Sequence, residues 1–177
     1  RSLVQIQSPR LEPRGSGRCG HNPRMPAIGL LGDVMLGRSV RDHLREAPAA
    51  ELWSDEMRTL CGSLDLMICN LECSVSERGE RTRRIPGKPF FFRGPAAAAE
   101  ALRAIGVRAV SLANNHALDY EEEALADTLE LLAGSGIAAG GAGAGTEAAR
   151  RPVVAEAGGR RVGMLCVADH PHEYAAG

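Results

Sequence analysis

Residues 107–120 read VRAVSLANNHALDY, and this stretch decides how the chain folds. The apolar run Val107–Leu112 has the composition of a buried β-strand, and it stops at two amides, an imidazole and a carboxylate. Four side chains that can bind a metal or move a proton therefore follow one strand end within six residues. Open α/β sheets place their ligand sites at the carboxyl ends of their strands.

Two similar strand ends occur upstream. Ala27–Asp33 (AIGLLGD) predicts a buried strand that ends in Asp33, and Leu64–Leu71 (LDLMICNL) predicts a second buried strand that is followed by Glu72. Alternating strands and helices predict an α/β fold with a largely parallel sheet. Helices are expected within Val40–Leu60 and over Ala96–Ile105 and Glu121–Ala133, a long loop over 76–95, a short strand over Ile137–Ala139, and a hairpin formed by Val153–Glu156 and Arg161–Ala168.

Composition excludes several classes of protein. The 177 residues suffice for one domain, and the net charge of −1 implies no general attraction to nucleic acid or to an anionic membrane. Aromatic residues, at 3%, are too scarce for base-stacking platforms. The sequence contains no apolar run of about 20 residues that would cross a bilayer. Of the 21 basic residues only Lys88 is a lysine, which we attribute to GC-rich coding.

The five cysteines are odd in number and form no CxxC pair, so we interpret them as free thiols, which favours a reducing compartment. Residues 1–26 are rich in arginine and proline and predict a disordered, non-native leader, with Met25 as a plausible true start. Residues 27–177 are expected to form the domain. The cysteines are Cys19, Cys61, Cys69, Cys73 and Cys166.

Asp, Glu, Asn and His at converging strand ends offer hard oxygen and imidazole ligands, which suit Mn²⁺, Mg²⁺, Fe or Zn²⁺. Such a metal could activate water and polarise a phosphoryl oxygen. Each residue alone has a plainer interpretation. Asp33 could cap the following helix, and Asp119 is favoured as the N-cap of the helix that begins near Glu121.

Three motifs together resemble the CapA family of poly-γ-glutamate capsule-synthesis proteins, which are distant relatives of calcineurin-like metallophosphoesterases. The motifs are Gly32–Arg38 (GDVMLGR), Asn70–Glu72 (NLE) and Ser111–Tyr120 (SLANNHALDY). The resemblance implies a metallophosphoesterase-like α/β sandwich, in which two sheets lie between helices. This chain would supply its N-terminal part: one mostly parallel sheet, flanking helices and part of the second sheet.

The resemblance also implies roles for individual residues. Asp33 and Glu72 stand where the superfamily binds metal, with Asn70 beside Glu72 in the second motif. Asn115 and His116 match the Asn-His pair whose amide binds metal and whose histidine faces the phosphoryl group as general acid. Asn114 would shape the turn and lie beside the substrate. Arg38 could hold an anionic substrate or simply cap and solvate its helix, and the sequence leaves both interpretations open.

The chain departs from the superfamily pattern at several points. Met35 replaces the usual first-motif histidine, the second motif has lost its Gly-Asp, and Glu121 stands where the family usually has glycine. The family continues with later histidine motifs, so we expect the chain to be truncated at its C-terminus. His170 and His172 are expected to belong to a polar tail rather than to bind metal. An unfinished second sheet would leave one face open and allow association through exposed apolar residues.

These observations leave three functions in competition. The first is a metal-dependent phosphoesterase that acts on an anionic polymer or a phosphate ester. The second is a non-catalytic, polymer-binding role in poly-γ-glutamate biosynthesis or export, and the third is an inactive fragment that lacks the C-terminal histidine ligands. Free thiols slightly favour the cytoplasm, whereas family members are often anchored outside it, so the location stays open.

Overall fold

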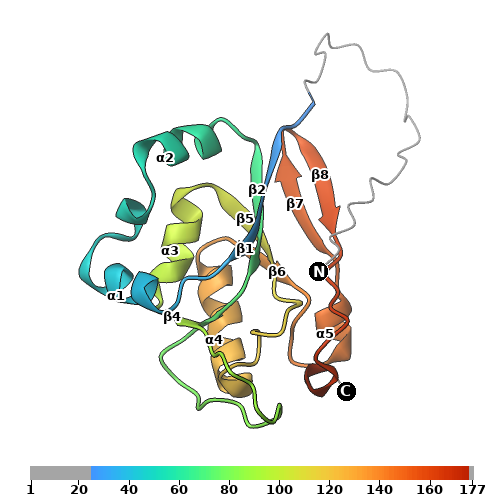
Figure 1. Cartoon of the computed structure of the whole chain (residues 1–177). Coiled ribbons are helices and arrows are strands. Elements are labelled where there is room, and N and C mark those ends of the chain that lie inside the picture. Colours follow the sequence, from blue (N-terminus) through green and yellow to red (C-terminus); the bar gives the residue numbers. More distant parts are fainter. Residues whose placement is uncertain (1–24, 176–177) are drawn as a thin grey trace, which may run out of the picture.

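The computed structural model describes residues 25–175, and its centre is a four-stranded parallel sheet (Figure 1). The strand order is β1-β2-β5-β6, and each strand runs parallel to its neighbour. The α/β prediction is confirmed, and the architecture is the N-terminal part of a metallophosphoesterase-like fold. The strands are β1 (Ile28–Val34), β2 (Leu66–Leu71), β5 (Val107–Ser111) and β6 (Ala138–Gly140).

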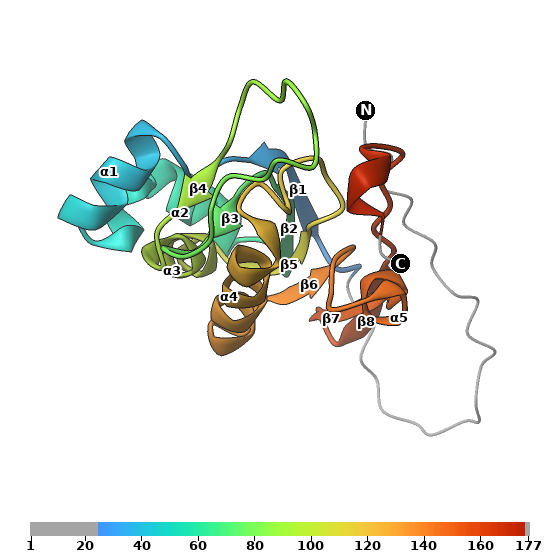
Figure 2. The ribbon, with the colours of Figure 1, turned by 90° about the horizontal axis from the view of Figure 1, so that it is seen from below.

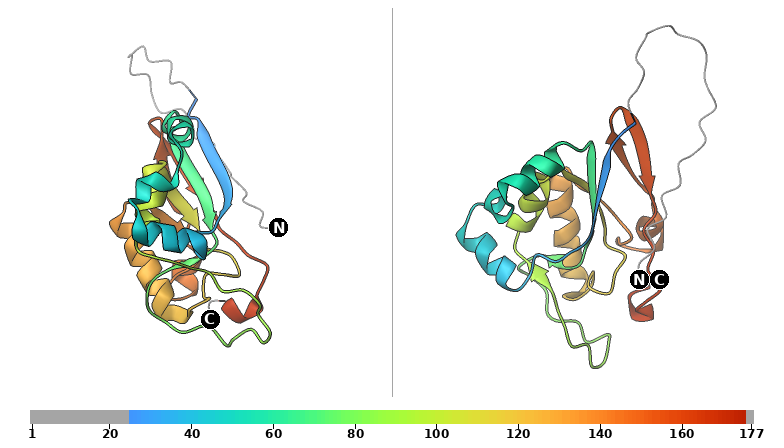
Figure 3. Two further views of the ribbon diagram at one scale, coloured as in Figure 1. Left: turned by 60° about the vertical axis from the view of Figure 1, so that its left-hand side comes forward. Right: turned by 45° about the horizontal axis from the view of Figure 1, so that its top comes forward.

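The helices that connect these strands cover one face of the sheet (Figure 3). Parallel strands joined by right-handed crossovers place the connecting helix on a fixed side. Because the strand order advances in one direction from β1 to β6, each crossover puts its helix on the same face. The crossovers contain α1 (Ser39–Glu46), the 3₁₀ helix η1 (Ala49–Leu52), α2 (Asp55–Gly62), α3 (Ala97–Ala104) and α4 (Glu121–Gly134).

The larger part of the core lies between this face and the helices. All six residues of β2 are buried, as its apolar sequence predicted, and Leu102 of α3 and Leu132 of α4 are fully enclosed against the sheet. Cys69 and Cys73 belong to this core, and burial raises the pKa of each thiol to about 12. Both are therefore unreactive thiols, and the described cysteines are free, as expected.

The opposite face of the sheet is only partly covered. The antiparallel hairpin of β7 (Val153–Ala157) and β8 (Arg160–Met164) packs on it, and the predicted hairpin is confirmed. Its turn residues Gly158 and Gly159 both have positive φ, which is typical of a tight two-residue turn. Leu30 of β1 stays 58% exposed, so the hairpin does not cover the whole face.

Strand β1 differs from its prediction. The sequence Ala27–Asp33 predicted a buried strand, but β1 lies at the edge of the sheet and pairs only with β2 among the described strands. Six of its seven residues are exposed or half-buried, and Val34 alone is buried. An apolar run signals burial on both faces, but at the edge of the sheet β1 is only partly covered: Ile28 packs against the hairpin cluster, whereas Leu30 is 58% exposed.

A long loop over residues 76–92 extends from the carboxyl edge of the sheet, between β3 (Ser74–Val75) and β4 (Arg93–Gly94). Ion pairs fasten the loop to α4: Arg78 pairs with Asp127, and Arg84 pairs with Glu121. Gly79 has φ of +82°, and a Cβ there would lie 2.1 Å from the carbonyl oxygen of Tyr120. The loop can therefore approach the 112–120 turn closely only because residue 79 is glycine.

The C-terminal part of the described chain contains two short helices, α5 (Thr146–Arg150) and the 3₁₀ helix η2 (His172–Tyr174). Tyr174 packs against the edge of the main core. The leader predicted for residues 1–26 lies outside the described residues except for Met25 and Pro26. Within residues 25–175, no helix is both long and apolar enough to span a bilayer.

Candidate functional site at the carboxyl edge of the sheet

Three strand ends meet at one edge, as the sequence predicted. Strand pairing places Asp33 of β1 opposite Asn70 of β2, and Asn70 opposite Ser111 of β5. Figure 2 looks onto this edge and shows loop 76–92 in green beside the turn that follows β5 in yellow. Side chains from residues far apart in sequence are thus brought together by parallel pairing alone.

Asp33 and Glu72 form the first half of the site, which we call the carboxylate corner. One amide group, the Asn70 Nδ2, donates to Asp33 Oδ1 at 2.9 Å and to Glu72 Oε1 at 2.6 Å. Asn70 therefore bridges the two carboxylates without neutralising them. Asp33 is exposed and Glu72 is half-buried.

The carboxylate corner carries unbalanced negative charge. Burial raises the pKa of Glu72, and the neighbouring Asp33 carboxylate raises it further. The His116 imidazole and the Asn70 amide lower it in part. A carboxylate with a raised pKa beside a second carboxylate is a common feature of sites that bind cations or transfer protons.

His116 and Asp119 form the second half, which we call the histidine corner. His116 Nδ1 lies 2.7 Å from Asp119 Oδ2, and Phe92 N–H donates to the same oxygen at 2.6 Å. The Lys88 ammonium lies 3.1 Å from Asp119 Oδ1. Asp119 is fully buried. His116 Nε2 lies 3.9 Å from Glu72 Oε2, so the two corners face each other.

The expectation that Asp119 caps helix α4 is wrong. The N-cap position of α4 is Tyr120, and no side chain caps the helix there. Asp119 instead points into the protein, where the imidazole of His116 and the loop 76–92 supply its partners. An N-cap is a local bond within four residues, whereas Phe92 and Lys88 come from a loop 27 or more residues upstream, which local spacing cannot reveal.

The bonding of Asp119 fixes the tautomer of neutral His116. The Asp119 carboxylate accepts the Phe92 N–H and faces an ammonium group, so it acts as an ionised acceptor. The Nδ1 atom of His116 must therefore carry its hydrogen and donate to Asp119. Nε2 is left with a lone pair directed at the carboxylate corner, which suits proton transfer to or from a bound group.

Two residues of the histidine corner were not identified as functional from the sequence. The Phe92 ring stacks on the His116 imidazole, with ring centroids 4.1 Å apart and an interplanar angle of 28°. Lys88 binds Asp119, although its loop predicted no site. A signal was present: Lys88 is the sole lysine of the chain, and coding bias explains the arginines but not the exception. Phe92 had no comparable signal.

The adjacent asparagines Asn114 and Asn115 differ in their bonding. Asn114 Oδ1 accepts the His116 N–H at 2.9 Å, which shapes the turn, and its Nδ2 donates to Asn70 Oδ1 and to the Leu71 carbonyl. These bonds give Asn114 a structural role. Its contact with substrate stays a prediction. Within residues 25–175 the Asn115 side chain makes no hydrogen bond, while its carbonyl accepts from Lys88 Nζ. Asn115 as a metal ligand stays a prediction.

Arg38 lies at the outer rim of the site. It occupies the N-cap position of α1 with φ of +54°, a conformation that non-glycine residues rarely adopt, and its side chain caps nothing. The guanidinium lies over the rings of Phe90 and Phe92, at 5.2 and 4.8 Å from the centroids. Among the described residues it has no ion-pair partner. A cation held on aromatic faces without a counter-ion is free to bind an anion.

The donor chemistry of the carboxylate corner fits a divalent ion, but the described residues do not close a site around one. Asp33 and Glu72 offer hard oxygens, and their mutual repulsion is what a cation would relieve. However, no group of three or more His, Cys, Asp and Glu side chains within residues 25–175 is arranged to hold a metal. The predicted metal site therefore stays a proposal.

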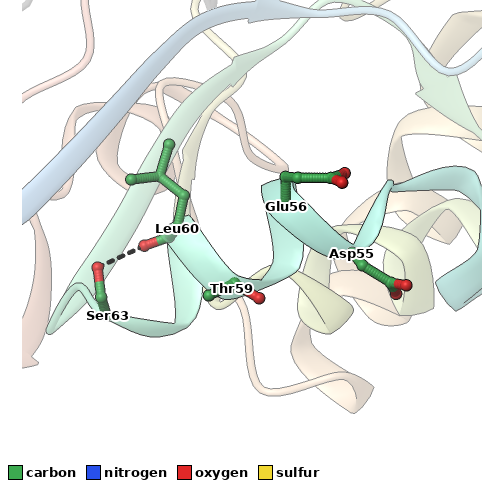
Figure 4. Close-up of a pocket in the computed structure, with 5 residues that line it drawn as sticks. All are labelled: Asp55, Glu56, Thr59, Leu60 and Ser63. Atoms are coloured by element: carbon green, nitrogen blue, oxygen red, sulfur yellow. Dashed lines mark hydrogen bonds between the residues drawn. The ribbon is translucent and has the colours of Figure 1, made fainter.

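His170 and His172 lie apart from both corners. They border a cavity of about 720 Å³ together with Leu112, Leu125 and the glycine-rich segment 141–145. A second, more open depression lies along α2, where Asp55, Glu56, Thr59, Leu60 and Ser63 form its surface (Figure 4). Helix α2 precedes β2, so this depression is at the amino edge of the sheet, away from the strand ends.

Comparison with known proteins places these motifs in a family. A family model described as bacterial capsule synthesis protein PGA_cap matches residues 27–177. Two proteins named probable polyglutamine synthesis accessory protein, from the CDC 1551 and H37Rv strains of Mycobacterium tuberculosis, are each 31% identical over 172 residues. Each alignment covers 79% of this chain and 44% of the relative. The chain thus spans less than half the length of these relatives.

Proposed function

Because this chain belongs to the bacterial capsule synthesis protein family PGA_cap, which is the CapA family, we propose that it acts in making a capsule polymer of glutamate type. The site at the carboxyl edge would contribute a metal-assisted phosphoester-cleaving activity. The two mycobacterial relatives, named as accessory proteins of polyglutamine synthesis, support the polymer class. The activity is proposed for this chain and for any longer protein that contains it.

One observation carries the proposal. The buried Asp119 carboxylate holds His116 so that Nε2 faces Glu72, and thereby the Asp33–Glu72 pair, across 3.9 Å. Nε2 makes no hydrogen bond among residues 25–175, and its approach to Glu72 is 3.9 Å. Here one nitrogen is fixed by a buried acid, and the other is left at the mouth of an anionic corner. This is the arrangement that general acid–base chemistry requires.

Asp33, Glu72 and Asn115 would hold a divalent ion, of which Mn²⁺ and Mg²⁺ best suit oxygen ligands. Bound there, the ion would activate water and polarise a phosphoryl oxygen. His116 would give a proton to the leaving group from Nε2, while Asp119 stabilises the charged imidazole. The Phe92 ring covers one face of His116 and restricts water there.

Arg38 would bind the anionic part of the substrate. Its guanidinium lies 4.8 Å from the centroid of the Phe92 ring, which itself stacks on His116, so Arg38 and the imidazole contact the same aromatic ring. The rare backbone conformation at Arg38 costs free energy, on the order of 1 kcal/mol, which structures tolerate mainly at functional positions. Both a phosphate ester and a polyglutamate carboxylate match this chemistry.

The test measures Mn²⁺ binding by calorimetry and hydrolysis of bis(p-nitrophenyl) phosphate after dialysis against EDTA and addition of Mn²⁺. Asp33→Asn should weaken binding at least tenfold and abolish hydrolysis. His116→Gln should leave Mn²⁺ binding within about twofold and lower kcat by about 10² or more. Asp42→Asn and His43→Gln, which change exposed residues of α1, serve as matched controls and should match the unmodified chain.

Two results would contradict the proposal. If the unmodified chain shows no saturable Mn²⁺ binding, the proposed role of a metal ion at this site is wrong. Binding that survives Asp33→Asn and Glu72→Gln unchanged would place the ion elsewhere. Repeating both measurements on a longer protein that includes this chain distinguishes a wrong site from an incomplete one.

A second function, binding of polyglutamate without catalysis, is favoured by the surface of loop 76–92. Arg38 and Arg83 are exposed and have no ion pair among the described residues. Poly-γ-glutamate carries one carboxylate per residue, so such arginines suit it. Binding of poly-γ-glutamate by these arginines should persist in EDTA and weaken as the salt concentration rises. Its affinity should be lower in the Arg38→Gln variant. Loss of polymer binding on chelation would argue against it.

A further inference from the structure

Lys88 is a compact cation in an unusual place. Every other one of the 21 basic residues is an arginine, and the Lys88 side chain is only 6% exposed. It projects from loop 76–92 into the turn between β5 and α4. A coding bias towards arginine replaces lysine at every position where either side chain is tolerated. The exception thus marks a position where the ammonium group itself is needed.

The contacts of Lys88 show what the ammonium does. Nζ donates to the Asn115 carbonyl at 2.6 Å and lies 3.1 Å from Asp119 Oδ1. One group therefore ties residues on both sides of His116. The rings of Phe91 and Tyr174 lie 5.9 and 5.8 Å from Nζ, so the charge is also enclosed by aromatic side chains.

Asp119 depends on this ammonium for one of its two oxygens. Oδ2 receives Phe92 N–H and His116 Nδ1, whereas Oδ1 is buried and receives no hydrogen bond within residues 25–175. The Lys88 charge at 3.1 Å is what balances Oδ1, as an ion pair whose geometry falls short of a hydrogen bond. An uncompensated buried carboxylate is strongly destabilising.

The shape of the charged group explains why the cation is lysine. An ammonium is a point charge with three rotatable donors, so it can serve a carbonyl and a carboxylate that lie in different directions. A guanidinium is a planar fork that suits one carboxylate from one side. At this position the two targets of the ammonium, the Asn115 carbonyl and Asp119 Oδ1, belong to residues on either side of His116.

We propose that Lys88 is the positioning residue of the histidine corner: by binding Asn115 and Asp119 together, it holds the His116 turn so that Nδ1 donates to Asp119 and Nε2 faces Glu72. Its catalytic consequence rests on the proposed function, while its effect on His116 does not. Docking of loop 76–92 and assembly of the histidine corner are then one event. Without the ammonium, the turn loses its tie at Asn115, the imidazole rotates, and both neutral tautomers become populated.

The test reads the His116 tautomer directly. Long-range ¹H–¹⁵N spectra of the ¹⁵N-labelled chain are recorded in EDTA, at a pH where imidazoles are neutral. His116→Gln identifies the His116 signals by their loss. The unmodified chain should show His116 wholly as the Nδ1–H form. Lys88→Met should show a mixture of both tautomers, and Lys88→Arg an intermediate share.

Arg81→Met is the matched control, because Arg81 is an exposed cation on the same loop and lies over the same Phe91 ring. It should leave the His116 signals unchanged. A folded Lys88→Met chain with the wild-type tautomer would overturn the proposal. If Lys88→Met does not fold, Lys88→Leu decides in the same way, since it also removes both the donor for Asn115 and the charge beside Asp119. If neither neutral variant folds, a Lys88→Arg chain whose His116 tautomer populations equal those of the unmodified chain overturns the proposal.

Activity supplies a second readout. In Lys88→Met, kcat should fall by about 10-fold to 100-fold while KM changes little, because the variant disturbs the imidazole and not the substrate contacts. The two proposals fail separately. A chain that neither binds Mn²⁺ nor hydrolyses, yet shows the expected spectra, refutes the proposed function alone. Unchanged spectra in a chain that hydrolyses refute the Lys88 role alone.

Discussion

The two halves of the site are built in opposite ways. In the histidine corner, the Asp119 carboxylate is fully buried and is surrounded by an ammonium, a backbone N–H and an imidazole. In the carboxylate corner, Asp33 and Glu72 repel each other, and between them lies a neutral amide. The difference teaches that the fold supplies partners for the charge of the histidine corner by itself, whereas the carboxylate corner keeps negative charge that the described residues do not balance.

The largest effect should come from Asp119→Ala. The change leaves the Lys88 ammonium, the Phe92 N–H and His116 Nδ1 without their partner inside the protein. We expect the free energy of unfolding to fall by about 3–5 kcal/mol, measured by urea denaturation. Asp33→Ala, at the exposed carboxylate, should change it by less than about 0.5 kcal/mol. Equal losses at the two positions would abolish the contrast between the corners.

The next effect concerns metal. A cation that binds the carboxylate corner of the folded chain stabilises it by about 2.7 kcal/mol when its free concentration is 100 times Kd. Mn²⁺ should therefore raise the Tm of the unmodified chain and of His116→Gln, but not that of Asp33→Asn or Glu72→Gln. A Tm that rises equally in all four proteins would show binding outside the carboxylate corner.

A smaller effect is expected from Glu72→Gln without metal. The pKa of Glu72 is raised in the folded state, so its contribution favours folding below the unfolded-state pKa and is lost as the pH rises through the folded-state pKa. At pH 7 the ionised group therefore destabilises the fold. Removing its charge should stabilise the chain by about 0.5 kcal/mol after solvent screening, and the gain should vanish near pH 4. A loss of stability at pH 7 would mean that Glu72 is already balanced within the fold.

The smallest effect should come from the exposed ion pairs that fasten loop 76–92. A hydrogen bond from Arg78, with help from Ser76, lowers the pKa of Asp127, so this stabilisation is present above the unfolded-state pKa and is lost as the pH falls. Asp127→Asn should cost about 0.5 kcal/mol, and 1 M NaCl should erase most of that difference. Glu80→Gln on the same loop is the control. An Asp127→Asn loss as large as that of Asp119→Ala would show that surface pairs, rather than Lys88, hold the loop.

Much of the fold could be predicted because its signals are local. The apolar run of β2, the helix after Tyr120 and the turn at Gly158 and Gly159 each follow from neighbouring residues. The burial of β1 was predicted wrongly, because an apolar run does not reveal whether a second layer covers the strand. In the candidate site, the convergence of Asp33, Glu72 and His116 followed from parallel pairing.

The partners within the site could not be predicted, because they depend on how a long loop docks. The spacing of Asp119 suits an N-cap, and nothing near it in sequence shows that Lys88 and Phe92 will reach it first. Arg38 was left between two interpretations: its side chain makes no cap hydrogen bond to helix α1, and its role in holding an anionic substrate stays a prediction. Whether Asp33, Glu72 and Asn115 bind a metal stays a prediction.

By itself, the sequence determined the α/β class, the family and the edge where the polar side chains gather, because periodicity and strand order depend on residues close along the chain. Only the tertiary structure decided that the Asp119 carboxylate orients the His116 ring and that the Lys88 ammonium balances the charge of Asp119. The reason is physical: a buried carboxylate takes whichever donors the packed fold brings to it, and here two of them come from a loop that extends beyond the carboxyl edge of the sheet.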